Sequence, residues 1–173
     1  MEKEIKLTTK LDEIVYRKAY LDAIGIKKKI PWLIALGIIL IIADSMLFIM
    51  GELNDIVDIL YFVLLPVVPI AMILFMYFIL PKMQYNSKSV LYNMNYGFIF
   101  NSEGFTVEAI SNGSKSNSII KYEKLNKVKE SKYNVLIYIT NNQFYILDKN
   151  QCNENIQEVI ALLKSKVKKY KIV

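Results

Sequence analysis

The sequence predicts an α+β membrane protein. In this fold a transmembrane α-helical hairpin is followed by a small antiparallel β-meander, or partial barrel, that a C-terminal helix caps. Three observations predict it. Two long apolar runs lie between residues 30 and 80, strand-like runs bounded by turn residues extend from residue 97 to 147, and apolar residues at helical spacing close the chain.

The composition of the 173-residue chain excludes several classes of site. It contains no histidine, which is the commonest general base and metal ligand. Cys152 is its only cysteine, so neither an intrachain disulfide nor a cluster of thiolate ligands can form. Glycine-rich phosphate loops and the GxSxG, HExxH and CxxC motifs are absent. We therefore predict that the protein is not an enzyme, and we expect no catalytic residue, no cofactor and no metal site.

The two apolar runs predict a transmembrane hairpin at residues 30–80, with spans at residues 30–50 and 59–80. Each run reaches the length of about 20 mostly apolar residues that a bilayer core requires. Asp44 is the only charged residue within them. It suggests either an ion or proton site or, more simply, a side chain that reaches the outer headgroups or a protonated acid. Pro66 and Pro69 should kink the second helix.

The distribution of charge around the hairpin predicts its orientation. The eight-residue link at residues 51–58 carries three acids and no base. Basic residues precede the first span and follow the second, namely Lys27, Lys28, Lys29, Lys82 and Lys88. Cytoplasmic flanks of membrane spans are enriched in lysine and arginine. We therefore predict a multi-pass protein of the cell (plasma) membrane with both termini in the cytoplasm.

Residues 1–29 are predicted to form a separate cytoplasmic head. Residues 4–8 alternate in the manner of a short strand. Thr9 and Asp12 then resemble a capping box that opens a helix ending near Gly25. This helix could lie on anionic lipid or pack on the soluble domain.

Residues 81–96 are predicted to be a connector, partly helical at residues 88–95, and residues 97–173 a β domain with a C-terminal helix. Expected strands lie at residues 97–100, 105–110, 118–121, 127–131, 135–139 and 143–147. Gly104 is expected at a left-handed turn position, and Asn112-Gly113 is a strong hairpin signal within a long polar loop at residues 111–118. Asn153 should cap the final helix. The apolar face of that helix consists of Ile156, Val159, Ile160, Leu163 and Val167.

This order of elements resembles the YcxB-like family of bacterial membrane proteins. The residues that carry the resemblance are Phe98-Ile99-Phe100 with Gly104-Phe105, the segment 120–128, Val135-Leu136-Ile137-Tyr138, Phe144-Tyr145-Ile146-Leu147 and the final helix. Tyr122 stands where a tryptophan is common in the family, and Leu147-Asp148-Lys149 where Ile-Pro-Lys is common. The resemblance implies a pleckstrin-homology-like (PH-like) domain at residues 97–173, and it implies no established activity.

A second basic run follows the third expected strand. Its lysines, together with those that precede the hairpin, are candidates for contact with the membrane surface: Lys27, Lys28, Lys29, Lys121, Lys124, Lys127 and Lys129. The alternative is an ordinary solvated face. Nucleic acid is not an expected partner, because arginine is nearly absent and the aromatic residues fall on strands with core spacing.

Three functions remain open. The first is a membrane-tethered module, in which the C-terminal domain binds a protein partner or a second copy, or regulates one. The lipid bilayer would be its other partner, and a groove between the final helix and the adjacent sheet edge would accept a strand. The second is an immunity or stress protein that acts through its hairpin. The third is an accessory subunit of a transporter or pore.

Overall fold

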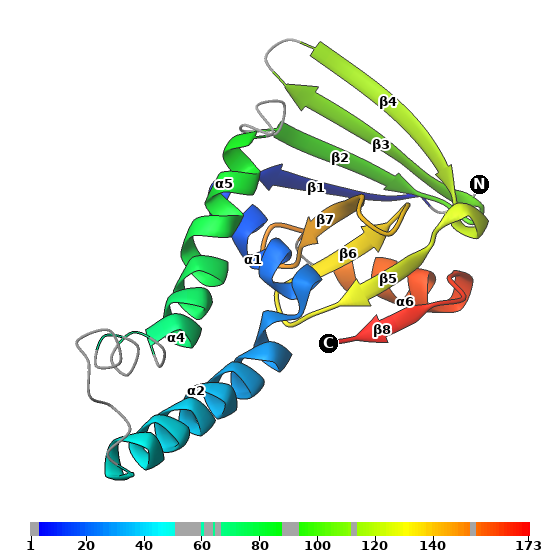
Figure 1. The fold of residues 1–173 in the computed structure, drawn as a ribbon. Coiled ribbons are helices and arrows are strands. Elements are labelled where there is room, and N and C mark those ends of the chain that lie inside the picture. Colours follow the sequence, from blue (N-terminus) through cyan, green and yellow to red (C-terminus); the bar gives the residue numbers. More distant parts are fainter. Residues whose placement is uncertain are drawn as a thin grey trace. The chain divides into compact units, whose positions relative to one another are not determined.

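A computed structural model of the chain describes residues 4–50, 60, 64, 67–87, 94–111, 114–152 and 155–173 (Figure 1). The chain divides into two compact units. The first, which we call the α+β unit, combines Met1–Ile24 with Lys82–Val173. The second, the hairpin unit, comprises Gly25–Pro81. The hairpin is therefore inserted into the sequence of the α+β unit.

The hairpin unit contains two packed helical segments. Helix α2 spans Ile26–Ile49, and helix α4 spans Val67–Leu74 and continues as a π-helical turn, η1, at Phe75–Ile79. Gly37 of α2 lies against Pro69 of α4, where a Cβ on the glycine would stand 3.8 Å from the proline Cβ. Small residues at such contacts let two helices approach closely.

Two helices of the described chain are long and apolar enough to cross a membrane, at Lys28–Leu47 and Val67–Asn86. They overlap both predicted spans. The second helical stretch continues through α5, Leu80–Ser87, so the first part of the predicted connector is helical. Pro66, the acidic link and most of residues 59–66 lie outside the described residues. Among the described residues, the irregularity of the second stretch is the π-helical turn at η1, which is a recognised way of inserting a residue into a helix.

Four strands of the α+β unit form sheet A, in the order β1-β2-β3-β4 (Figure 1). They are β1 at Ile5–Leu11, β2 at Met94–Phe100, β3 at Gly104–Ser111 and β4 at Ser114–Lys121. All neighbours are antiparallel. Leu7 pairs with Phe98, and Phe98 with Val107, so that apolar side chains share one face.

The other four strands form sheet B, in the order β7-β6-β5-β8. They are β5 at Lys127–Glu130, β6 at Asn134–Tyr138, β7 at Phe144–Asp148 and β8 at Tyr170–Ile172. Strand β8 runs parallel to β5, so this sheet is mixed. The single antiparallel meander expected from the sequence is thus divided between two sheets, and the three-residue C-terminal strand was not predicted.

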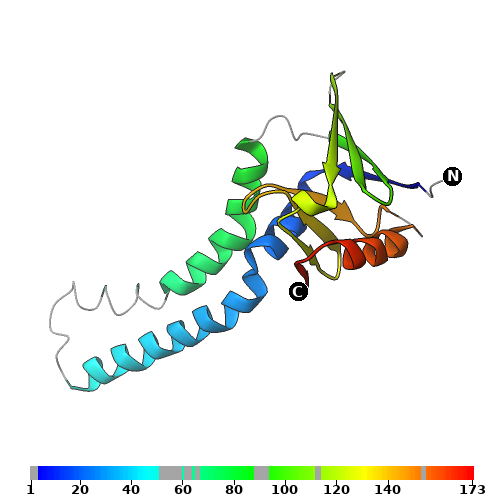
Figure 2. The same ribbon diagram turned by 90° about the vertical axis from the view of Figure 1, so that its right-hand side faces the viewer.

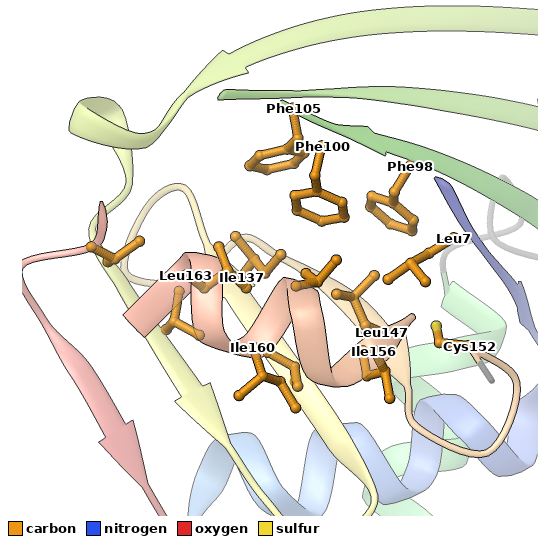
Figure 3. Packing of buried hydrophobic residues seen from close by; sticks show 14 of the residues in the cluster. Leu7, Phe98, Phe100, Phe105, Ile137, Leu147, Cys152, Ile156, Ile160 and Leu163 are labelled. Carbon is orange, nitrogen blue, oxygen red and sulfur yellow. The ribbon is translucent and has the colours of Figure 1, made fainter. Parts of the chain in front are cut away.

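The main core lies where sheet A, sheet B and helix α6, Ile156–Lys166, meet. Figure 3 shows Phe98, Phe100 and Phe105 of sheet A pointing toward this helix, with Ile137 and Leu147 of sheet B beside it. The predicted apolar face of the final helix is confirmed, because its members are all buried. Val167 belongs to this core although the helix ends one residue before it.

Helix α1, Glu13–Ile24, covers the opposite face of sheet B. Leu136 and Tyr138 of β6 point toward it, whereas Val135 and Ile137 point into the main core. Strand β6 is consequently buried along its whole length. This burial on both faces explains why its sequence is a continuous apolar run.

The N-terminal segment differs from the predicted separate head, because β1 pairs with β2 along its whole length. The capping box at Thr9 is wrong: the strand extends to Leu11, and Thr9 is buried within it. Asp12 caps α1 instead, since its Oδ1 accepts a hydrogen bond of 2.8 Å from the backbone N–H of Val15. The strand-forming and helix-starting signals overlap in the sequence, and pairing with β2 decides between them.

Gly104 also has a different role from the one predicted. Among the described glycines, Gly25 has a positive φ, of 66°, whereas Gly104 does not. A Cβ on Gly104 would overlap the carbonyl oxygen of Ile120 and stand 3.1 Å from Cα of Lys121. The glycine therefore permits close approach of two backbones where β3 begins beside the end of β4.

Two further expectations concern connections. The predicted polar loop at residues 111–118 is largely strand, because β4 begins at Ser114 and places it opposite Ser111. The predicted helix at residues 88–95 is wrong at its end, since β2 begins at Met94. Residues 88–93, Asn112-Gly113 and the predicted cap Asn153 lie outside the described residues.

Glu130 ties the C-terminal strand to the unit. Its carboxylate accepts hydrogen bonds from Lys149 at 2.8 Å and from the hydroxyl of Tyr170 at 2.7 Å, and Lys164 lies 3.2 Å away. Burial acts to raise the pKa of Glu130, but the hydrogen bonds and positive charges outweigh it and lower the pKa to about 2. Burial, followed by the hydrogen bond to this carboxylate, raises the pKa of Tyr170. The group joins β5, β8, α6 and the end of β7.

Candidate functional site

Sheet A has two outer strands, β1 and β4. One hydrogen bond beside β2 and β3 determines which backbone groups of these outer strands face away from the sheet. The N–H of Asn101, the residue after β2, donates to the carbonyl of Gly104 at 3.0 Å, so Asn101 and Gly104 are a hydrogen-bonded pair. In an antiparallel ladder successive residues bond to alternate sides. Ser116, Ser118 and Ile120 of β4 therefore bond to β3, and the intervening residues do not. Lys115, Asn117 and Ile119 direct their N–H and C=O groups away from the sheet.

The same alternation leaves Lys6, Thr8 and Lys10 of β1 with outward-facing backbone groups. Here the edge is partly closed by the segment that follows β7. The side-chain amide of Gln151 accepts a bond of 2.6 Å from the N–H of Lys10 and donates one of 3.1 Å to its carbonyl. It thus occupies both positions that a neighbouring strand would use. Protection of an edge in this way is a common defence against strand addition.

Cys152 covers the neighbouring outward-facing residue of the same edge, Thr8. Its Sγ lies 3.6 Å from the carbonyl of Thr8 and 3.2 Å from Oγ1 of Thr9. The side chain is buried, and this burial raises the pKa of the thiol. The cysteine consequently serves as a packing residue and a weak donor beside β1.

Strand β4 carries no such closure. Among the described residues it pairs with β3 alone, and the side chains from Lys115 to Ile119 are all exposed. Ile119 is 83% exposed, which is unusual for an isoleucine on a strand. In both ribbon views the β3–β4 hairpin extends beyond sheet B and α6 (Figures 1 and 2).

The sequence of β4 also lacks the usual features that prevent strand addition. It contains no proline, and no charged residue occurs from Ser116 to Ile120. Lys115 at its start is paired with Glu108 of β3, with 3.8 Å between Nζ and Oε2. An open, nearly uncharged edge of this length is a template for a further strand. We therefore regard β4 as the candidate functional site.

Two hollows of the α+β unit are the other candidates. One, of about 700 Å³, lies between Ile5 of β1 and Leu162 and Ser165 of α6, where a groove beside a sheet edge was expected. The other, of about 160 Å³, is lined by Tyr16, Tyr96 and the segment 142–146. Burial and the nearby Tyr145 raise the pKa of Tyr96 to about 12. A cavity of that size holds a benzene-sized group and is smaller than most ligand sites.

The lysines predicted to contact the membrane surface are divided between the two units. Lys28 and Lys29 are exposed at the start of α2, and the side chain of Lys27 lies outside the described residues. Lys121 and Lys124 are exposed in the α+β unit. Lys121 lines a hollow of about 440 Å³ that also contains two other lysines and two glutamates, so its surroundings are of mixed charge.

Lys127 and Lys129 have contacts within the protein. Both lie over the ring of Tyr138, with Nζ 4.5 Å and 5.6 Å from its centroid. Lys129 also donates a hydrogen bond of 2.9 Å to the carbonyl of Ala23, in the last turn of α1. A cation at that position stabilises a helix C-terminus, which gives Lys129 a structural role.

The described residues contain no group of three or more histidine, cysteine, aspartate or glutamate side chains that could hold a metal ion. In the hairpin unit, Oδ2 of Asp44 is buried and has no hydrogen-bond partner among the described residues.

Sequence reasoning did not single out β4. The available signal was the Asn112-Gly113 dipeptide. It favours a tight hairpin, and a tight hairpin after β3 predicts a further strand paired with β3.

Comparison with known proteins adds one finding. No curated protein and no solved structure matches the chain. The family model described as YcxB-like protein matches residues 100–163, from the end of β2 through most of α6, and this match confirms the resemblance to the YcxB-like family seen in the sequence.

Proposed function

We propose that the protein is an integral membrane protein of the YcxB-like type that presents its α+β unit, a PH-like domain, as a tethered interaction module at the cytoplasmic face. Two helices of sufficient length and apolarity support the anchor. The basic flanks and the acidic link in the sequence support the orientation. The YcxB-like match lies within the module.

The anchor and the module are parts of one chain, because the hairpin is inserted between α1 and the rest of the α+β unit. Insertion of the hairpin would tether the module to the bilayer. Tethering raises the effective concentration of neighbouring membrane proteins.

The observation that carries this proposal is the contrast between the two edges of sheet A. Gln151 and Cys152 occupy outward positions on β1, whereas β4 is open and uncharged over its central residues. Strand addition provides affinity through main-chain hydrogen bonds and needs no catalytic group. The module would bind an extended protein segment at β4 and turn over no substrate.

Replacing Asn117 by proline should abolish this binding. The N–H of Asn117 points away from β3, so proline removes one outward donor and obstructs an approaching strand while the pairing with β3 remains. We expect the affinity behind the complexes that the full-length protein forms in native membranes to fall by more than about fivefold, since one lost backbone hydrogen bond removes about 1 kcal/mol and the proline ring also obstructs the partner strand. Native electrophoresis of gently solubilised membranes measures the loss.

Two controls sharpen this experiment. Asn117→Thr keeps the N–H in a residue that favours strands, and it should retain the complex. Replacement of residues 28–80 by an unrelated two-helix anchor should retain it as well. A complex that survives Asn117→Pro, or that disappears when only the anchor is exchanged, contradicts the proposal; the second result would favour a function of the hairpin itself.

A further inference from the structure

We propose that the strand that pairs with β4 is β4 of a second copy of this chain, in antiparallel pairing about a two-fold axis at Asn117. The inference rests on the proposed function and names the partner at that same edge. It follows from three features of sheet A: the residues that face outward on β4, the positions of its charges, and the closure of β1.

The outward-facing residues of β4 are self-complementary in this register. Asn117 lies opposite Asn117 of the second copy, and Lys115 lies opposite Ile119. Two asparagine amides can exchange hydrogen bonds across the axis. The aliphatic stem of Lys115 can cover Ile119 of the other copy, which is 83% exposed in the single chain. Two such contacts are formed, one on each side of the axis.

The charges favour this register over a shifted one. Glu108 lies 3.8 Å from Lys115 in the same chain and offsets its charge. A shift of the pairing by two residues toward the end of β4 would place Lys115 opposite Lys121 of the other copy. Like charges directly opposite each other destabilise a strand pair. A shift in the other direction leaves Ile119 opposite Gly113, which has no side chain to cover the exposed isoleucine.

The closure of β1 determines what kind of assembly can form. If β4 of one copy paired with β1 of the next, each addition would leave new open edges and produce a filament. Gln151 occupies both backbone groups of Lys10, and Cys152 contacts the carbonyl of Thr8, so the β1 edge resists such pairing. Pairing of β4 with β4 joins two four-stranded sheets into one whose outer strands are both β1. The assembly therefore ends as a dimer.

Single cysteines on β4 test this arrangement in the full-length protein. Directly opposed residues in a hydrogen-bonded antiparallel pair have Cα atoms about 5.5 Å apart, which suits a disulfide. In native membranes treated with a mild oxidant, Asn117→Cys should form a covalent dimer. Ile119→Cys alone should not, because it lies four residues along the strand from its copy. A mixture of differently tagged Lys115→Cys and Ile119→Cys chains should crosslink to each other.

The wild-type protein is the control for Cys152, which is buried and should give no crosslinked dimer. Absence of the Asn117→Cys dimer overturns the inference, as does self-crosslinking of Ile119→Cys in its place. If Asn117→Cys instead attaches to another protein, and Asn117→Pro still removes the complex, then the second copy is excluded while β4 remains a binding edge. Survival of the complex in Asn117→Pro is the separate result that rejects the proposed function.

Discussion

A full-length protein carrying Leu163→Asp is expected to lose the folded structure of its α+β unit. Leu163 is fully buried in the core where α6 meets both sheets (Figure 3). An unpaired charge in such a core costs several kcal/mol, and a domain of this kind is stable by only about 5–15 kcal/mol. Leu163→Asp therefore removes a large share of the total stability.

The reactivity of Cys152 measures this effect without a truncated chain. Cys152 is the only thiol in the sequence, it belongs to the same buried cluster as Leu163, and it should react with a maleimide only when the core opens. In detergent-solubilised protein, Leu163→Asp should be labelled rapidly and the wild type slowly. Ala161→Asp, which places the same charge on an exposed position of α6, should be labelled as slowly as the wild type. Equal labelling of Leu163→Asp and wild type would show that the side chain is not in the core.

Gly104→Ala is expected to weaken the joint between β3 and β4. The added methyl group would overlap the carbonyl oxygen of Ile120, and this neighbour is backbone rather than a flexible side chain. The two strands must move apart beside Phe105 and Ile120, both of which pack in the core. Forcing extra volume into a packed site costs about 1–3 kcal/mol. We expect a loss at the upper end of this range, because the backbone ladder is displaced.

Gly97→Ala is a matched control in the same sheet. A Cβ on Gly97 meets its nearest neighbour, Cβ of Glu108, at 3.7 Å, which is an ordinary van der Waals contact. Its free energy of unfolding should change by less than about 1 kcal/mol. Denaturation of the full chain, followed by Cys152 labelling, compares the two variants. Similar stabilities for both would mean that the approach of β3 to β4 does not require a glycine.

Much of the fold follows from local patterns in the sequence. The apolar runs, the order of the strands from residue 97 to 148 and the apolar face of α6 are all periodic signals that neighbouring residues carry. The pairing of β1 with β2 joins segments about 90 residues apart in the chain, across the whole hairpin. No local pattern specifies that pairing, and for this reason residues 1–29 were predicted to form a separate head.

The amino-acid composition of β4 prevented its prediction as a strand, and therefore as the candidate site. Serine and asparagine dominate residues 111–118, and such residues favour turns over strands. In the structure, pairing with β3 overrides this preference. Residues 115–119 stay exposed, and Ile120 at the end of the strand packs in the core. Gly104 shows a related limit, because a glycine needed for close backbone approach and a glycine needed for a left-handed turn look alike in the sequence.

Amide hydrogen exchange at single-residue resolution tests the central claim, that β4 is the binding edge, most directly. In the protein assembled in native membranes or in nanodiscs prepared from them, the amides of Lys115 and Ile119 should be as protected as those of Ser116 and Ser118, which bond to β3. In Asn117→Pro, Lys115 and Ile119 should exchange rapidly while Ser116 and Ser118 stay protected. Rapid exchange of Lys115 and Ile119 in the assembled wild type would contradict strand addition at this edge.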